Sequence, residues 1–125
     1  MARILIIDDE PVTRAMLQEM LKQAGHETVS AVNGTEGVKQ YLDKPADLVI
    51  TDLFMPEKDG LEVIKELRMQ FPAVAIIAMS GKAVGGKMLS VAHALGAVEV
   101  LQKPFTSVEL LSIVEKVLRK ESVRA

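Results

Sequence analysis

The chain has 125 residues, about half of them apolar, with 15 basic and 17 acidic side chains. This length gives one domain of ordinary size, and the net charge of −2 argues against a basic surface for nucleic acid. Because the sequence has no cysteine, disulfides and thiolate metal sites are excluded. The apolar runs are too short to cross a bilayer, and the first residues lack the long apolar stretch of a signal peptide, so we expect a cytoplasmic protein.

The first half of the chain alternates short apolar runs with helical periodicity. Residues 4–7 form a β-branched run typical of a strand buried on both faces. Pro11 suits the first turn of the helix that follows. Residues 27–32 are more polar and predict an edge strand, residues 37–42 predict a short helix, and residues 48–51 predict a second buried strand.

The second half continues the alternation. Four elements follow in the order helix, strand, helix, strand, at residues 63–71, 74–79, 88–95 and 98–101. The last helix carries an apolar stripe, which consists of Leu111, Val114 and Leu118. Five strands alternating with five helices predict an α/β fold, a mostly parallel sheet covered by helices on both faces. We expect one domain at residues 1–121 and a flexible tail at residues 122–125.

Polar residues stand where the predicted strands end. Asp8 and Asp9 follow the first strand, Asp52 the third, Ser80 the fourth and Lys103 the fifth. In open α/β sheets the ligand site lies beyond the carboxyl ends of the strands. We therefore expect three carboxylates, a hydroxyl and an ammonium group to converge at one edge of the sheet.

Clustered carboxylates repel one another and raise each other's pKa, and a hard divalent cation such as Mg²⁺ relieves that repulsion. Such a site would accept a phosphoryl group, whose charge the metal offsets during transfer. A carboxylate can be the nucleophile, which gives an aspartyl-phosphate. Lys103 would then pair with the phosphoryl oxygens, and Ser80 would donate a hydrogen bond to them.

Four motifs occur at these strand ends in a fixed order. They are Asp8-Asp9, the segment from Asp52 through Pro56 to Gly60, Ser80-Gly81, and Lys103-Pro104-Phe105. In their order and spacing, from about residue 3 to residue 119, the chain resembles the receiver domains of two-component response regulators. The resemblance implies a doubly wound, flavodoxin-like (βα)5 fold with strand order 2-1-3-4-5.

The resemblance also implies roles for individual residues. Asp52 resembles the phosphoacceptor, and it would share the metal with Asp9 as direct ligand and with Asp8 acting mainly through water. The backbone carbonyl of Phe54 would supply a further metal ligand. A cis peptide bond is implied between Lys103 and Pro104.

By the same resemblance, the chain is expected to be a signalling switch that catalyses its own phosphorylation and dephosphorylation without being a turnover enzyme. The phosphoryl group would come from a histidine kinase, a phosphotransfer protein or a small phosphodonor. Phosphorylation would change the surface of the fourth helix, fifth strand and fifth helix, around Val84 to Lys116, and so alter binding of a protein target. We expect no contact with nucleic acid or membrane, and a monomer or a phosphorylation-dependent dimer.

Some positions depart from the usual family pattern or tune it. Val100 stands three residues before Lys103, where the family usually has a Tyr or Phe that rotates on activation. Residues 81–87 are rich in glycine, which adds backbone freedom. In the family, the side chains at the positions of Phe54 and Lys82 flank the path of the water that removes the phosphoryl group.

Three other functions compete with this interpretation. A phosphatase of the haloacid-dehalogenase type normally needs an Asp two residues after its nucleophile, where this chain has Phe54, which cannot transfer a proton. A flavin or nucleotide carrier needs a phosphate-binding loop after the first strand, where the acids from Asp8 to Glu10 would repel phosphate. A receiver module cut from a longer regulator is the third alternative; with no output region following, the chain resembles the stand-alone type.

Overall fold

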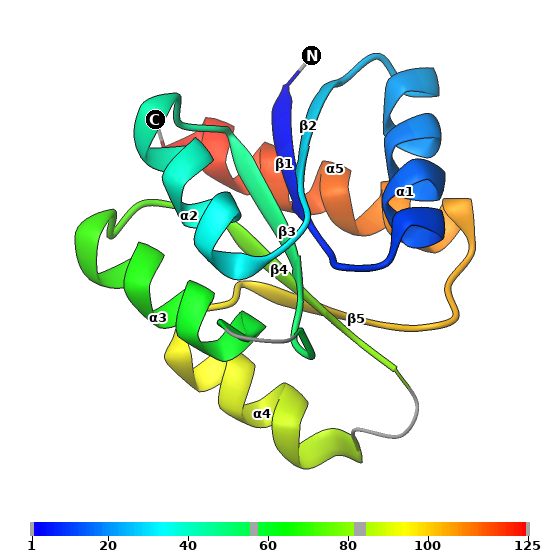
Figure 1. Ribbon diagram of the computed structural model, residues 1–125. Helices are drawn as coiled ribbons and strands as arrows, with labels where there is room; N and C mark the ends of the chain where they lie inside the picture. Colours follow the sequence, from blue (N-terminus) through cyan, green and yellow to red (C-terminus); the bar gives the residue numbers. More distant parts are fainter. Residues whose placement is uncertain (1, 56–57, 82–84, 125) are drawn as a thin grey trace.

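The computed structural model describes residues 2–55, 58–81 and 85–124. It contains one sheet of five parallel strands in the order β2-β1-β3-β4-β5, as the resemblance implied (Figure 1). The strands are β1 (Arg3–Ile7), β2 (Glu27–Ala31), β3 (Leu48–Asp52), β4 (Ile76–Ser80) and β5 (Glu99–Gln102). β3 and β4 are buried along their whole length, whereas β2 is mostly half-exposed, which confirms it as a polar edge strand.

Five helices alternate with the strands. They are α1 (Pro11–Gln23), α2 (Gly34–Asp43), α3 (Gly60–Gln70), α4 (Gly85–Leu95) and α5 (Ser107–Arg124). Successive residues of a strand point to opposite faces of the sheet. Ile4 and Ile6 therefore belong to the core under α1 and α5, and Leu5 and Ile7 to the core under α2, α3 and α4. Figure 1 shows the two layers of helices on either side of the sheet.

The ends of the helices follow the signals in the sequence. Asn33 accepts a hydrogen bond from the Glu36 N–H at 2.8 Å and caps α2. Thr106 and Glu109 form a reciprocal capping box before α5, at 3.1 and 3.0 Å. Asp59 caps α3 by accepting from the Glu62 N–H at 2.9 Å.

The buried stripe of α5 differs from the predicted one. Its centre is Leu110, Val114 and Val117, while Leu111 and Leu118 pack at the edge of the core. Both stripes have helical spacing, so periodicity alone does not say which of two adjacent leucines faces the sheet. The helix continues to Arg124, past residue 121, where we expected the domain to end.

Residues 85–87, predicted as part of a glycine-rich loop, form the first turn of α4, and Lys82 lies outside the described residues.

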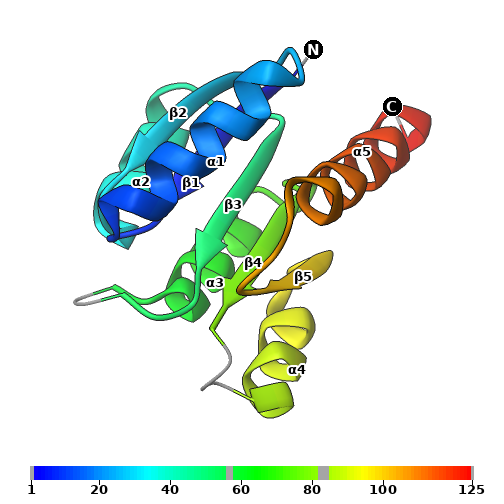
Figure 2. The same cartoon turned by 90° about the vertical axis from the view of Figure 1, so that its right-hand side faces the viewer.

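All strands are parallel, so their carboxyl ends lie together at one end of the sheet, here named the carboxyl edge. Both chain termini lie at the opposite end, the amino edge (Figure 2). None of the helices in the described part of the chain has the length and hydropathy needed to span a membrane.

Candidate functional site

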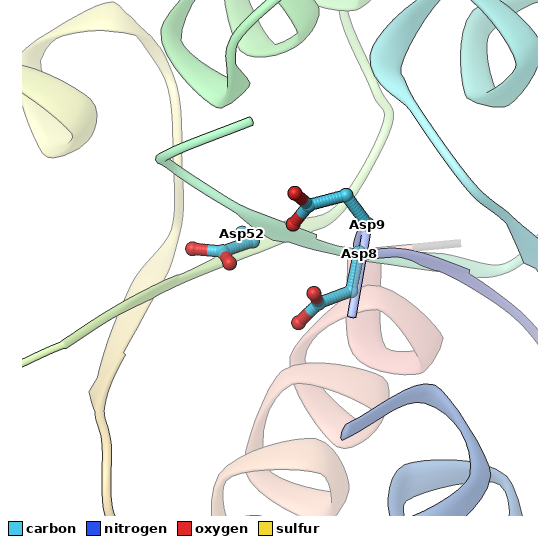
Figure 3. Close-up of side chains that lie close together, drawn as sticks. All are labelled: Asp8, Asp9 and Asp52. Carbon is cyan, nitrogen blue, oxygen red and sulfur yellow. The ribbon is translucent and has the colours of Figure 1, made fainter. Parts of the chain in front are cut away.

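The strand register brings the predicted acids together at the carboxyl edge. β1 and β3 are neighbours, and Ile7 lies opposite Thr51. The next residues along the two strands, Asp8 and Asp52, therefore leave the sheet side by side. Carboxylate oxygens of Asp8, Asp9 and Asp52 lie within 4.8 Å of one another. In Figure 3 Asp8 and Asp9 project from consecutive positions at the end of β1, beside Asp52.

The turn after β1 is held by the main chain and by Arg14. The Asp8 N–H donates to the Ala31 carbonyl at 3.2 Å, and the Glu10 N–H donates to Asp8 Oδ1 at 2.9 Å. Arg14 Nη1 donates to the Asp8 carbonyl at 2.7 Å. These bonds fix Asp8, which is fully buried, while Asp9 stays exposed at the mouth of the site.

Lys103 joins two of the acids. Its Nζ lies 3.1 Å from both Asp8 Oδ2 and Asp52 Oδ2. Burial alone would lower the pKa of Lys103, but the carboxylates of Asp52 and Asp8 outweigh it and raise the pKa above its usual value. Lys103 is therefore a fixed cation at neutral pH, placed between two carboxylates on neighbouring strands.

Asp8 is in the opposite situation. Burial raises the pKa of Asp8, and the Asp52 carboxylate adds to the effect; the hydrogen bond from Glu10 and the charge of Lys103 offset it only in part. Ionisation of Asp8 therefore lowers the stability of the folded chain. The described residues balance the negative charge of this carboxylate only in part.

The residues present fit a divalent cation. Three carboxylates face one ammonium group, which leaves two negative charges in excess. An octahedral Mg²⁺ holds its oxygens at about 2.0–2.1 Å, so ligands on opposite sides lie about 4 Å apart. The spread of the three carboxylates, within 4.8 Å, is of that size. Asp8, Asp9 and Asp52 could hold such an ion, with waters reaching it past exposed Asp9.

Ser80 supplies an unused hydrogen-bonding group. The residue is 1% exposed, and its Oγ has no hydrogen-bond partner among the described residues. A buried hydroxyl without a partner is unusual in a folded protein. The Lys103 N–H donates to the Ser80 carbonyl at 2.7 Å, which ties the end of β4 to the residue after β5. Ser80 and Lys103 are therefore adjacent at the same edge.

The other predicted residues lie as follows. Phe54 is 54% exposed, and its N–H donates to Asp52 Oδ1 at 3.3 Å. Val100 lies opposite Ala78 in the sheet and packs, half-buried, against the core. The Lys103–Pro104 peptide bond is cis.

One residue that shapes the site was not predicted from the sequence, and the role of another was left unexplained. Arg14, which holds the Asp8 carbonyl, has no motif of its own; its only signal is a basic residue in the first turns of the helix after the acids. Gly60 belongs to one of the sequence motifs, but the need for glycine at that position was not explained. A Cβ at Gly60 would lie 2.1 Å from the main-chain oxygen of Asp52, so only glycine lets α3 start this close to β3.

Comparisons with known proteins find relatives that match nearly the whole chain. The family model for the response regulator receiver domain matches residues 4–115. The chain is 37% identical over 117 residues to the chemotaxis protein CheY of Bacillus subtilis, covering 93% of this chain and 97% of that protein. The receiver domain protein of Clostridium thermocellum, a solved structure, superposes with a TM-score of 0.91 at 29% identity over 100% of both chains.

Longer relatives match over part of their length only. The chain is 32% identical over 126 residues to the alkaline phosphatase synthesis transcriptional regulatory protein PhoP of Bacillus subtilis, covering 98% of this chain and 51% of PhoP. It is 35% identical over 121 residues to the DNA-binding transcriptional regulator NtrC of Azospirillum brasilense, covering 97% of this chain and 25% of NtrC. The chain therefore spans about half of one of these relatives and a quarter of the other.

Proposed function

The chain belongs to the response regulator receiver domain family, and we propose that its Asp52 accepts a phosphoryl group with the help of Mg²⁺. The observation that carries this assignment is the position of Asp52. It ends a central strand between the acids after β1 and Ser80 on β4, with Lys103 Nζ 3.1 Å from its Oδ2. Asp52 thus contacts Lys103 and lies on the strand between the acids after β1 and Ser80.

The neighbouring acids are less suited to be the nucleophile. Asp8 is fully buried and its Oδ1 accepts from the Glu10 N–H at 2.9 Å, whereas Asp52 is 8% exposed and its Oδ1 accepts the longer bond from the Phe54 N–H at 3.3 Å. Asp9 is exposed and is better placed to bind the metal at the mouth of the site. As the resemblance to the family implies, we assign Asp9 and Asp52 as direct metal ligands, Asp8 as a ligand through water, and the Phe54 carbonyl as a further ligand.

The proposed transfer moves one phosphoryl group from nitrogen to oxygen. An Asp52 carboxylate oxygen attacks phosphorus while the bond to the donor's imidazole nitrogen breaks, and the electron pair of that bond stays on the imidazole. Lys103 then pairs with a phosphoryl oxygen, and the Ser80 hydroxyl donates to another. When bound, Mg²⁺ supplies charge neutralisation at the phosphoryl oxygens.

The same residues argue against a general phosphatase. Phe54 stands two positions after Asp52 and has no group that could protonate a leaving alcohol. The family is a signalling domain and not a classical enzyme. We propose that this chain promotes its own phosphorylation and dephosphorylation and has no other turnover.

The output follows from the same site. Ser80 turning toward the phosphoryl group would shift the segment that leads into α4, and Val100 has no ring to follow it. We propose that the surface of α4, β5 and α5 then changes its affinity for a downstream protein, that a histidine kinase or phosphotransfer protein is the donor, and that residues 1–121 form the receiver domain. The domain would act in the cytoplasm as a monomer or phosphorylation-dependent dimer, without direct contact with nucleic acid.

Intact mass after treatment with acetyl phosphate tests the assignment. With Mg²⁺, the chain should gain the mass of one phosphoryl group, and with EDTA it should gain none. Asp52→Asn should abolish the gain, whereas Asp43→Asn, which changes an exposed acid at the end of α2, should keep it. Undiminished labelling of Asp52→Asn would show that another residue is the acceptor.

A further inference from the structure

A second hollow lies at the amino edge of the sheet, away from the acidic site. It is a cavity of about 410 Å³ between the end of α3, the end of α4, the start of β5 and α5. Apolar side chains form much of its wall, among them Val74, Ala97 and Val117. The polar side chains of the wall are Arg68, His93 and Glu99, and polar and apolar atoms contribute to it about equally. A hollow in which a few charged side chains stand among apolar ones can hold a small molecule that has both kinds of group.

Arg68 is fixed in the wall of this cavity. Its Nη1 donates to the Pro72 carbonyl and its Nη2 to the Gly96 carbonyl, both at 2.6 Å. Gly96 has a φ of 131°, and a Cβ there would lie 2.7 Å from Arg68 Nε. The guanidinium is thus clamped between two loops, and its orientation is set before any ligand arrives.

The charge of Arg68 is not balanced by these contacts. Both of its acceptors are neutral carbonyls, which use two of the five N–H donors of the guanidinium. No carboxylate in the part of the chain that the structure describes lies within 4.0 Å of it. Glu99, the one acid in the cavity wall, is already paired with Lys116 at 3.0 Å.

We propose that this cavity binds a small organic anion with an apolar body, such as an aromatic or branched carboxylate, whose charged group pairs with Arg68. A preorganised guanidinium selects for a carboxylate or a similar oxyanion. The apolar side chains in the wall favour an occupant with a hydrocarbon body. An occupant would contact α4, β5 and α5 together, the three elements of the proposed output surface.

The experiment uses two fluorescent probes with the same rings. The first is 8-anilinonaphthalene-1-sulfonate, an amphipathic anion, and the second is N-phenyl-1-naphthylamine, which lacks the sulfonate. The anion should bind one per chain and at least about tenfold more tightly than the neutral compound. Amide shifts on binding should fall in residues 68–74 and 93–99. Equal affinity for the two probes, or shifts elsewhere, would overturn the proposal.

Variants at the mouth of the cavity separate charge from shape. Ala73 is exposed and lines the cavity. Ala73→Glu should weaken the anionic probe at least about tenfold relative to Ala73→Gln, a matched control of similar size. Arg68→Met should weaken it as much, with cooperative thermal unfolding as the check that the variant is folded. If Ala73→Glu binds the anion as Ala73→Gln does, the site is not selective for anions.

The acidic site provides the last control. Asp52→Asn should bind the anionic probe with unchanged affinity, because Asp52 lies at the opposite edge of the sheet. A loss of probe binding in Asp52→Asn would place the probe at the carboxyl edge and contradict the proposal. The two proposals can therefore be tested independently.

Discussion

The carboxyl edge of the sheet and the amino ends of β1 and β2 differ in how their charged side chains are paired and buried. At the carboxyl edge three carboxylates share one ammonium group, and two of the acids are buried. At the amino ends, Arg3 pairs with Glu27 across β1 and β2, and the Arg3 N–H donates to Asp47 at 2.8 Å. The second region balances Arg3 with Glu27 and leaves the Asp47 carboxylate exposed to water, whereas the first keeps an excess in the interior.

The difference shows where to look for ligands in this fold. Buried like charges cost the folded state free energy, so they persist where a bound group compensates them. The excess of two negative charges at the carboxyl edge is the amount that the proposed divalent cation would offset. Arg68 is a single positive charge that its hydrogen-bond partners do not balance. It also lies at the amino edge, near β4 and β5, and the second proposal rests on it.

The largest effect on stability is expected from the tight packing behind Asp52. Gly60→Ala would place a Cβ 2.1 Å from the Asp52 carbonyl oxygen and 2.6 Å from Leu53 Cα. Backbone must shift to relieve this contact, so we expect the free energy of unfolding to fall by about 1–3 kcal/mol or more. Gly81→Ala is the control, because its Cβ would meet nothing within 4 Å. Equal urea midpoints for the two variants would contradict the close approach of α3 to β3.

The next effect concerns the lifetime of the phosphorylated state. Phe54 is half exposed beside Asp52 and can crowd an attacking water but not orient it. Lys82, whose role is inferred from sequence alone, has donors only. Phe54→Asn with Lys82→Glu offers the water polar partners, so we expect phosphorylated protein to decay several-fold faster in excess Mg²⁺. Decay no faster than in the parent would mean that these side chains do not set the lifetime.

A smaller effect compares the two edges directly. The pKa of Asp8 is raised in the folded chain, so its ionisation costs stability as pH rises from the unfolded value of 3.8 through the raised one. Without metal, Asp8→Asn should therefore have a larger free energy of unfolding than the parent at pH 7, and the gain should vanish in acid below both values. Arg3→Met should instead lose up to about 1 kcal/mol, because it breaks a partly exposed ion pair.

Urea melts of both variants in EDTA, from acid to neutral pH, provide the measurement. A neutral-pH loss of stability in Asp8→Asn would mean that its hydrogen bonds outweigh its charge. A gain in stability in Arg3→Met would show that the charges at the amino edge are not balanced as described. Either result would remove the contrast between the two edges.

Much of the site could be predicted because its residues follow strands in sequence. The ends of parallel strands meet at one edge, so the acids, Ser80 and Lys103 could be grouped without knowing a single distance. The caps at Asn33 and Thr106 also depend on residues that are only three positions apart in the sequence.

Features that depend on how helices dock were not predictable in this way. The bond from Arg14 to the Asp8 carbonyl requires the angle at which α1 leaves the turn. The Arg68 clamp requires the loops after α3 and α4 to meet at one side chain, although Arg68 and Gly96 are 28 residues apart. The buried face of α5 differs from the predicted stripe because adjacent leucines fit the same periodicity.

Chemical location of the phosphoryl group tests the central claim most directly. Phosphorylated protein is reduced with borohydride, which converts an aspartyl-phosphate into homoserine, and is then digested and sequenced by mass spectrometry. We expect homoserine at position 52 alone, and only in samples phosphorylated with Mg²⁺. Homoserine at position 8 or 9, or at position 52 regardless of metal, would contradict the account of a metal-dependent acceptor at Asp52.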